Sequence, residues 1–168
     1  MSSHPRAQAK RWVRSEVGSS ATEFALVLPI LALLLLGFID VGRLVWSYSI
    51  VASSVRDASR FASRLSMNCG GFSNGADVAR VQRLTRTGTV DTGGTPLIKS
   101  WTSDGSVSVV ITCVDNSSLT YSGRYDGLDQ IPRVTVTAAA PYPSTGIGLL
   151  SMLQVATIRA SHAEVWTQ

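Results

Sequence analysis

A long apolar run with one acidic residue at its start limits the folds that are open to this chain. Residues 25–39 are almost uninterrupted in apolar character, and Glu23 and Phe24 stand directly before them. Residues 24–39 form about 24 Å of helix at 1.5 Å per residue, and residues 21–42 reach the roughly 30 Å of a hydrocarbon core. The run is therefore long enough to cross a bilayer. A carboxylate near the edge of such a helix is costly to bury, so Glu23 indicates a function and a charged partner.

A basic flank precedes the apolar run. Its cationic residues are Arg6, Lys10, Arg11 and Arg14, opposed by Glu16. An excess of Lys and Arg holds a flank in the cytoplasm, so the C-terminal part is expected outside. Arg43 can snorkel at the far end of the helix, and Trp46 and Tyr48 fall where an interfacial aromatic belt belongs. The pattern predicts a single-pass protein of the inner membrane with its C-terminal domain outside.

Two other interpretations of the segment stay open. A cleaved secretory signal also has a basic region before an apolar one, but residues 40–48 contain no convincing small-residue cleavage site. An uncut signal-anchor helix fits the apolar run, and it leaves Glu23 and a junction at Gly18 without a role. If the chain is cut after Gly18, Glu23 becomes the fifth residue of a new N-terminus. Its carboxylate could then neutralise the terminal amine of a neighbouring subunit in lipid.

The stretch from Gly18 to Arg43 carries a family signature. It reads GSSATEFALVLPILALLLLGFIDVGR. This stretch resembles the signature of the TadE-like minor pilins of the Tad (tight adherence, Flp, type IVc) pilus system. In that family a prepilin peptidase cuts after a Gly on the cytoplasmic side and leaves the Glu at position five. The resemblance implies processing between Gly18 and Ser19 and an assembly role for Glu23 and Phe24, where related prepilins often carry Tyr in place of the Phe.

The resemblance also implies a domain organisation and a set of partners. The segments are a cytoplasmic prepilin leader over residues 1–18, a transmembrane helix over residues 19–42 and an extracytoplasmic pilin-like domain over residues 43–168. The implied function is that of a minor pilin used in pilus initiation or assembly, supporting surface adhesion and biofilm formation as part of a fimbrium. The implied partners are the inner membrane, the prepilin peptidase, the Tad assembly platform, major Flp-type pilins and other minor pilins of the TadE or TadF type. An uncleaved single-pass scaffold of an envelope secretion complex is the alternative.

Charge and motif content argue against catalysis and nucleic-acid binding. The formal net charge is +4, of which four basic residues and one acidic residue of the leader supply +3, so about +1 remains after cleavage. A net charge this close to zero does not indicate the strongly basic surface that binds nucleic acid. The only histidines are His4 and His162, and the chain has no Cys-x-x-Cys pair near either of them. No local motif joins a nucleophile to a base. We expect no enzyme activity, no catalytic residue, no bound metal and no cofactor.

The chain has two cysteines, Cys69 and Cys113, and both fall in the part expected outside the membrane. On the oxidising side of a membrane, two cysteines in a small domain are expected to form a disulfide. The loop that this bond would close corresponds to about 4 kcal/mol in the chain-entropy model. Two buried free thiols are the alternative.

Helical periodicity continues beyond the membrane segment. Apolar and small residues recur at three- and four-residue steps through residues 44–65, so one long helix is expected over residues 20–65. Asn68, Gly70 and Gly71 are expected to end it. A second, shorter helix is expected over residues 76–86, with its arginines on a solvated face.

The last part of the chain favours strands. They are expected over residues 107–114, 134–140 and 155–166. The apolar stretch over residues 147–153 is too short to span a membrane; it is expected to close the core or contact a partner subunit, with membrane dipping as the alternative. The predicted fold class is α+β, a long N-terminal helix that leaves the membrane and packs on a small antiparallel sheet, as in pilin-like proteins.

Overall fold

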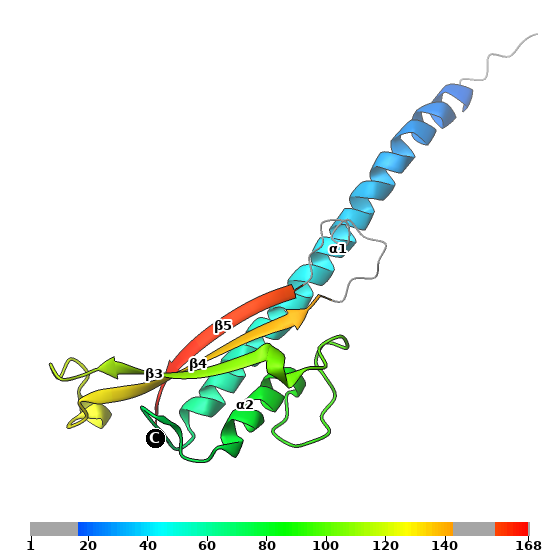
Figure 1. The fold of residues 1–168 in the computed structure, drawn as a ribbon. Helices are drawn as coiled ribbons and strands as arrows, with labels where there is room; N and C mark the ends of the chain where they lie inside the picture. Colours follow the sequence, from blue (N-terminus) through cyan, green and yellow to red (C-terminus); the bar gives the residue numbers. More distant parts are fainter. Residues whose placement is uncertain (1–16, 143–156, 168) are drawn as a thin grey trace, which may run out of the picture.

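A long helix dominates the molecule, for which the computed structural model describes residues 17–142 and 157–167. Helix α1 (Val17–Ser63) contains 47 residues and passes through Pro29 without ending. At 1.5 Å per residue it is about 70 Å long. Its N-terminal half extends away from the other elements, while its C-terminal half lies along the sheet (Figure 1). The single helix expected over residues 20–65 is therefore confirmed, apart from a few residues at each end.

A small hairpin follows α1 and corrects one prediction. Its strands are β1 (Met67–Asn68) and β2 (Gly71–Phe72). The side-chain Oδ1 of Asn68 accepts a hydrogen bond of 2.8 Å from the backbone N–H of Gly70. Gly71 has a φ of +138°, a conformation that residues with a Cβ rarely adopt. These residues therefore build the hairpin turn, and the prediction that they end the helix is wrong, because α1 has already ended at Ser63.

Helix α2 (Ala76–Thr87) confirms the shorter helix expected over residues 76–86. Gly88 ends it in the left-handed conformation, with a φ of 75°, and its backbone N–H donates to the carbonyl of Leu84 at 2.8 Å. Val81 points into the core and is fully buried. Asp77, Thr85 and Thr87 are buried as well, so the packed face of α2 is partly polar and was not predictable from the apolar spacing alone.

Two arginines of α2 do not form the solvated face that was expected. The Nε of Arg83 donates to the carbonyl of Val90 at 3.1 Å. Arg86 pairs with Asp104 in the 3-10 helix η1 (Asp104–Ser106), and its side chain is only 15% exposed. Both side chains have fixed acceptors in the chain that follows α2, so they tie the helix to that segment.

In the described part of the chain, the main sheet has three antiparallel strands with β4 in the centre. The strands are β3 (Val107–Asp115), β4 (Gln130–Pro141) and β5 (Thr157–Val165). All three coincide with predicted strands, although residues 155–156 lie outside the described residues. β4 starts earlier than expected because residues 130–133 pair with the end of β3. The 3-10 helix η2 (Gly123–Tyr125) lies in the connection between β3 and β4.

The core lies between the helices and one face of the sheet. α1 packs against β4 and β5, and α2 packs against β3 and α1. Alternate residues of β4 are buried, as expected when only one face of a sheet is covered. The fully buried residues at this contact include Val51, Val55, Ala58 and Ala62 of α1 and Val134, Val136, Ala138 and Ala140 of β4. The small side chains let helix and sheet approach closely, and the predicted α+β fold is confirmed.

Candidate membrane and assembly interface

The N-terminal half of α1 exposes a continuous apolar surface. From Ser20 to Ile39 every residue except the half-buried Gly37 is exposed. Its large exposed side chains are Phe24, Leu26, Val27, Leu28, Ile30, Leu31, Leu33, Leu34, Leu35, Leu36, Phe38 and Ile39. Within the described residues, α1 is one helix that by length and composition could cross a membrane. An apolar surface of this extent is unfavourable in water and is expected to be covered by lipid or by another protein. Its length fits the membrane helix of a single-pass membrane protein.

The residues predicted for processing and assembly lie together at the start of this surface. Gly18 and Ser19 belong to the first turn of α1, and Glu23 and Phe24 lie one turn further on. Glu23 is exposed, and the side chain of Phe24 is 59% exposed. The roles of these four residues in cleavage and assembly remain predictions. Residues 1–16, which include most of the predicted leader and His4, lie outside the described residues.

Asp40 marks the point where α1 leaves the exposed surface and joins the domain. It is the first buried residue of the helix after Ser20 and is only 7% exposed. Its backbone carbonyl accepts a hydrogen bond of 3.4 Å from the hydroxyl of the buried Tyr142, which follows β4. Among the described residues its Oδ2 has no hydrogen-bond partner, and leaving a buried acceptor unpaired typically costs about 1–3 kcal/mol. The sequence analysis missed Asp40, although a carboxylate within an otherwise apolar helix is a usable signal.

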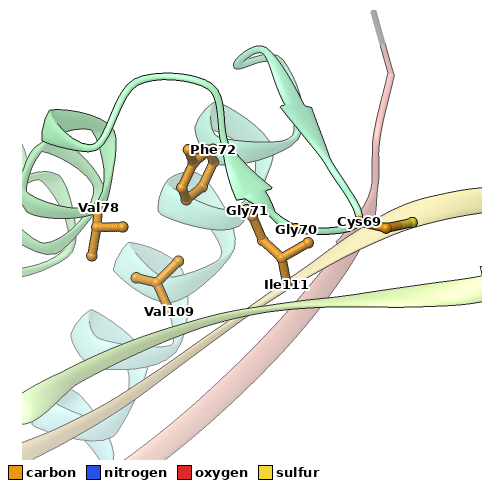
Figure 2. A pocket seen from close by; sticks show the side chains of 7 residues that line it. All are labelled: Cys69, Gly70, Gly71, Phe72, Val78, Val109 and Ile111. Carbon is orange, nitrogen blue, oxygen red and sulfur yellow. The ribbon is translucent and has the colours of Figure 1, made fainter.

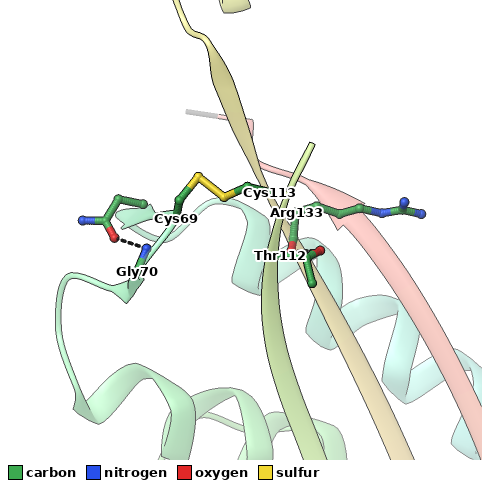
Figure 3. Close-up of a disulfide and its surroundings, with 6 residues drawn as sticks. Cys69, Gly70, Thr112, Cys113 and Arg133 are labelled. Carbon is green, nitrogen blue, oxygen red and sulfur yellow. Dashed lines mark hydrogen bonds between the residues drawn. A yellow bond between two sulfur atoms is a disulfide. The ribbon is translucent and has the colours of Figure 1, made fainter. Parts of the chain in front are cut away.

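A disulfide joins the hairpin to the sheet, as the sequence predicted. Cys69 and Cys113 are bonded, with 5.7 Å between their Cα atoms, and the alternative of free thiols is wrong. Figure 3 shows the bond running from the hairpin turn to β3. β3 is an edge strand, so the bond anchors the hairpin at that edge of the sheet. It fixes two segments that are 44 residues apart in the sequence.

A small cavity lies beside this disulfide (Figure 2). Its volume is about 180 Å³, and it is lined by Cys69, Gly70, Gly71, Phe72, Val78, Val109 and Ile111. None of these described residues carries a charged or acid–base side chain. In the described part of the chain, no cluster of three or more His, Cys, Asp or Glu residues could hold a metal ion. His162 on β5 contacts Glu164 at 3.0 Å.

The connection between β3 and β4 is organised by one side chain, that of Asn116. Asn116 is fully buried. Its side-chain amide donates to the carbonyls of Tyr121 at 3.1 Å and Leu128 at 3.0 Å, and its Oδ1 accepts from the backbone N–H of Tyr121 at 2.9 Å. One buried side chain therefore pairs with backbone groups at separate points of the connection and holds them together. The apolar stretch over residues 147–153, by contrast, lies outside the described residues.

Comparisons with known proteins bear on the same long helix. Residues 18–60 match the family model described as TadE-like protein. The comparisons with curated proteins and with solved structures give no match. The matched residues begin at the predicted cleavage position and end within the buried half of α1. Over this helix the chain is similar to TadE-like proteins, and the resemblance seen in residues 18–43 is confirmed.

Proposed function

We propose that this chain is a minor pilin of a Tad, or type IVc, pilus, cut by a prepilin peptidase and used to initiate or assemble a filament for surface adhesion. The observation that carries the proposal is the position of the TadE-like match. It covers the helix that exposes an apolar surface and also contains Gly18 and Glu23 at the prepilin spacing. A membrane-stored pilin needs these features together, because the same helix lies first in lipid and later among other subunits.

In this proposal the peptidase removes residues 1–18 on the cytoplasmic side, and Ser19 becomes the new N-terminus. The apolar half of α1 then holds the chain in the inner membrane until the Tad assembly platform extracts it. In the filament this half packs against major Flp-type and other minor pilins. Glu23 pairs with the terminal amine of an adjacent subunit, which neutralises both charges in a low-dielectric environment.

The disulfide supports the placement of residues 43–168 outside the cytoplasm. Disulfides persist in oxidising compartments and are rare where thiols are kept reduced. Cys69 and Cys113 both lie in the part that follows the apolar half of α1. A bonded pair is therefore consistent with the orientation that the basic N-terminal flank predicts.

Deleting the gene for this chain in its host tests the proposal. Sheared surface filaments and attachment to a surface should fall to the level of a strain without the major pilin, and the wild-type chain should restore both. A Lys99→Gln chain, altered in an exposed loop, is the matched complementation control and should restore both as well. Unchanged filaments and attachment in the deletion strain would refute the pilin function. Loss of protein secretion with normal filaments would favour the uncleaved scaffold instead.

A further inference from the structure

A second apolar feature lies where the exposed half of α1 meets the sheet. It is a groove of about 350 Å³ between α1 and the edge strand β5. Its lining residues are Leu44, Val45 and Tyr48 of α1 and Thr157, Ile158 and Arg159 of β5. The volume is within the range of pockets that hold small organic ligands. The groove begins one helical turn after Asp40, at the border between the exposed apolar surface and the domain.

The groove combines apolar walls with one cation. Leu44, Val45 and Ile158 supply carbon surface, and Tyr48 adds a ring that is about half exposed. Arg159 is exposed, and among the described residues it forms no ion pair and no side-chain hydrogen bond. A guanidinium group at the mouth of an apolar groove suits a ligand with an anionic head and a hydrocarbon body.

The groove is continuous with the surface of α1 that faces lipid in the proposed arrangement. Val41, Val45 and Trp46 are all more than half exposed and connect the two regions along the helix. Trp46 and Tyr48 lie at the level where aromatic side chains meet headgroups. A ligand in the groove would therefore lie in the outer headgroup layer, where phosphate and acyl carbons occur together.

We propose that this groove binds one phospholipid of the outer leaflet. The phosphate lies on the guanidinium of Arg159, and the glycerol and first acyl carbons lie against Leu44, Val45 and Ile158. The bound lipid seats the external domain on the membrane surface before extraction. This inference rests on the membrane-anchored arrangement of the proposed function, and it adds a binding site that pilus assembly does not by itself require.

Native mass spectrometry of the full chain, released from nanodiscs of mixed phosphatidylglycerol and phosphatidylcholine, tests the site. Arg159→Gln should weaken retention of phosphatidylglycerol about fivefold, the effect expected of one arginine near an anionic headgroup. Arg133→Gln is the matched control, because Arg133 is also an exposed arginine on the sheet but lies outside the groove. Its retention of phosphatidylglycerol should equal that of the wild-type chain.

A photo-crosslinking residue in place of Tyr48 gives a second measurement. It should form lipid adducts in the nanodisc, and these should decrease in the Arg159→Gln background. Equal lipid retention by the Arg159→Gln and wild-type chains would overturn the proposal, and so would crosslinks to a second protein chain in place of lipid. Insertion into the nanodisc is measured separately, so a failure of the membrane anchor is distinguishable from a failure of the groove.

Discussion

A chain carrying Glu23→Ala should be processed and inserted in the membrane, yet absent from surface filaments. If the terminal amine of an adjacent subunit is the partner of Glu23, the substitution leaves an ammonium group without compensation in the filament interior. Removing one member of a buried ion pair typically costs about 3–5 kcal/mol. The lower value corresponds to roughly a hundredfold loss in an association equilibrium. Insertion should not suffer, because the helix has lost a charge.

The measurement is the amount of the chain in sheared filaments relative to the amount in membranes. Asp91→Ala is the matched control, because it removes one exposed carboxylate from a loop of the external domain. It should leave the ratio at the wild-type value. If the Glu23→Ala chain enters filaments at the wild-type level, the pairing role is wrong, and Glu23 is only a tolerated charge at the edge of the helix.

Loss of the disulfide should strongly reduce the free energy of unfolding of the external domain. The bonded cysteines are 44 residues apart, which corresponds to about 4 kcal/mol in the chain-entropy model. Native domains are typically stable by only about 5–15 kcal/mol. The double variant Cys69→Ser, Cys113→Ser removes the bond without leaving a single thiol, and its urea midpoint should fall well below that of the wild-type chain.

The reduced wild-type chain is the internal control for this experiment. It should unfold at nearly the same urea concentration as the double variant. Without reductant both cysteines should resist alkylation, and with reductant both should react. An unfolding midpoint that does not change on reduction would show that the bond contributes nothing to stability, although it joins the hairpin to β3.

Long periodic elements of this fold were predictable, and short ones were not. α1 and α2 repeat apolar residues at helical spacing over enough turns to identify both helices. The β1–β2 hairpin has only two residues in each strand, which is too few for any period. Its turn residues were therefore assigned to the end of α1.

The start of β4 was missed for a different reason. Pro132 lies inside this central strand, where a proline normally argues against a strand. The carbonyl of Pro132 accepts a bond from Trp166, just beyond the end of β5, and the register between β4 and β5 begins only at Arg133. In an antiparallel strand the N–H and carbonyl of one residue point to the same side. The N–H that Pro132 lacks would therefore point toward β5, at a position just beyond the regular β4–β5 ladder.

The candidate interface was predictable from its motif but not in its tertiary details. Gly18, Glu23 and the apolar run follow each other in the sequence, so a local pattern suffices to find them. Asp40 and Asn116 acquire their surroundings only when distant segments fold against them, as with the contact between Asp40 and Tyr142. The apolar helix around Asp40 marks its carboxylate as unusual, but the local pattern does not show that this residue is buried beside Tyr142.

The mass of the mature chain decides whether a prepilin peptidase removes residues 1–18. In a host with an intact prepilin peptidase, mass spectrometry of the purified protein should show a chain that begins at Ser19 and lacks residues 1–18. The Gly18→Arg variant should keep its full length in the same host, because the peptidase requires the Gly before the cut. A wild-type chain that still begins at Met1, in cells whose other pilins are processed, would contradict the account and identify the chain as an uncut membrane anchor.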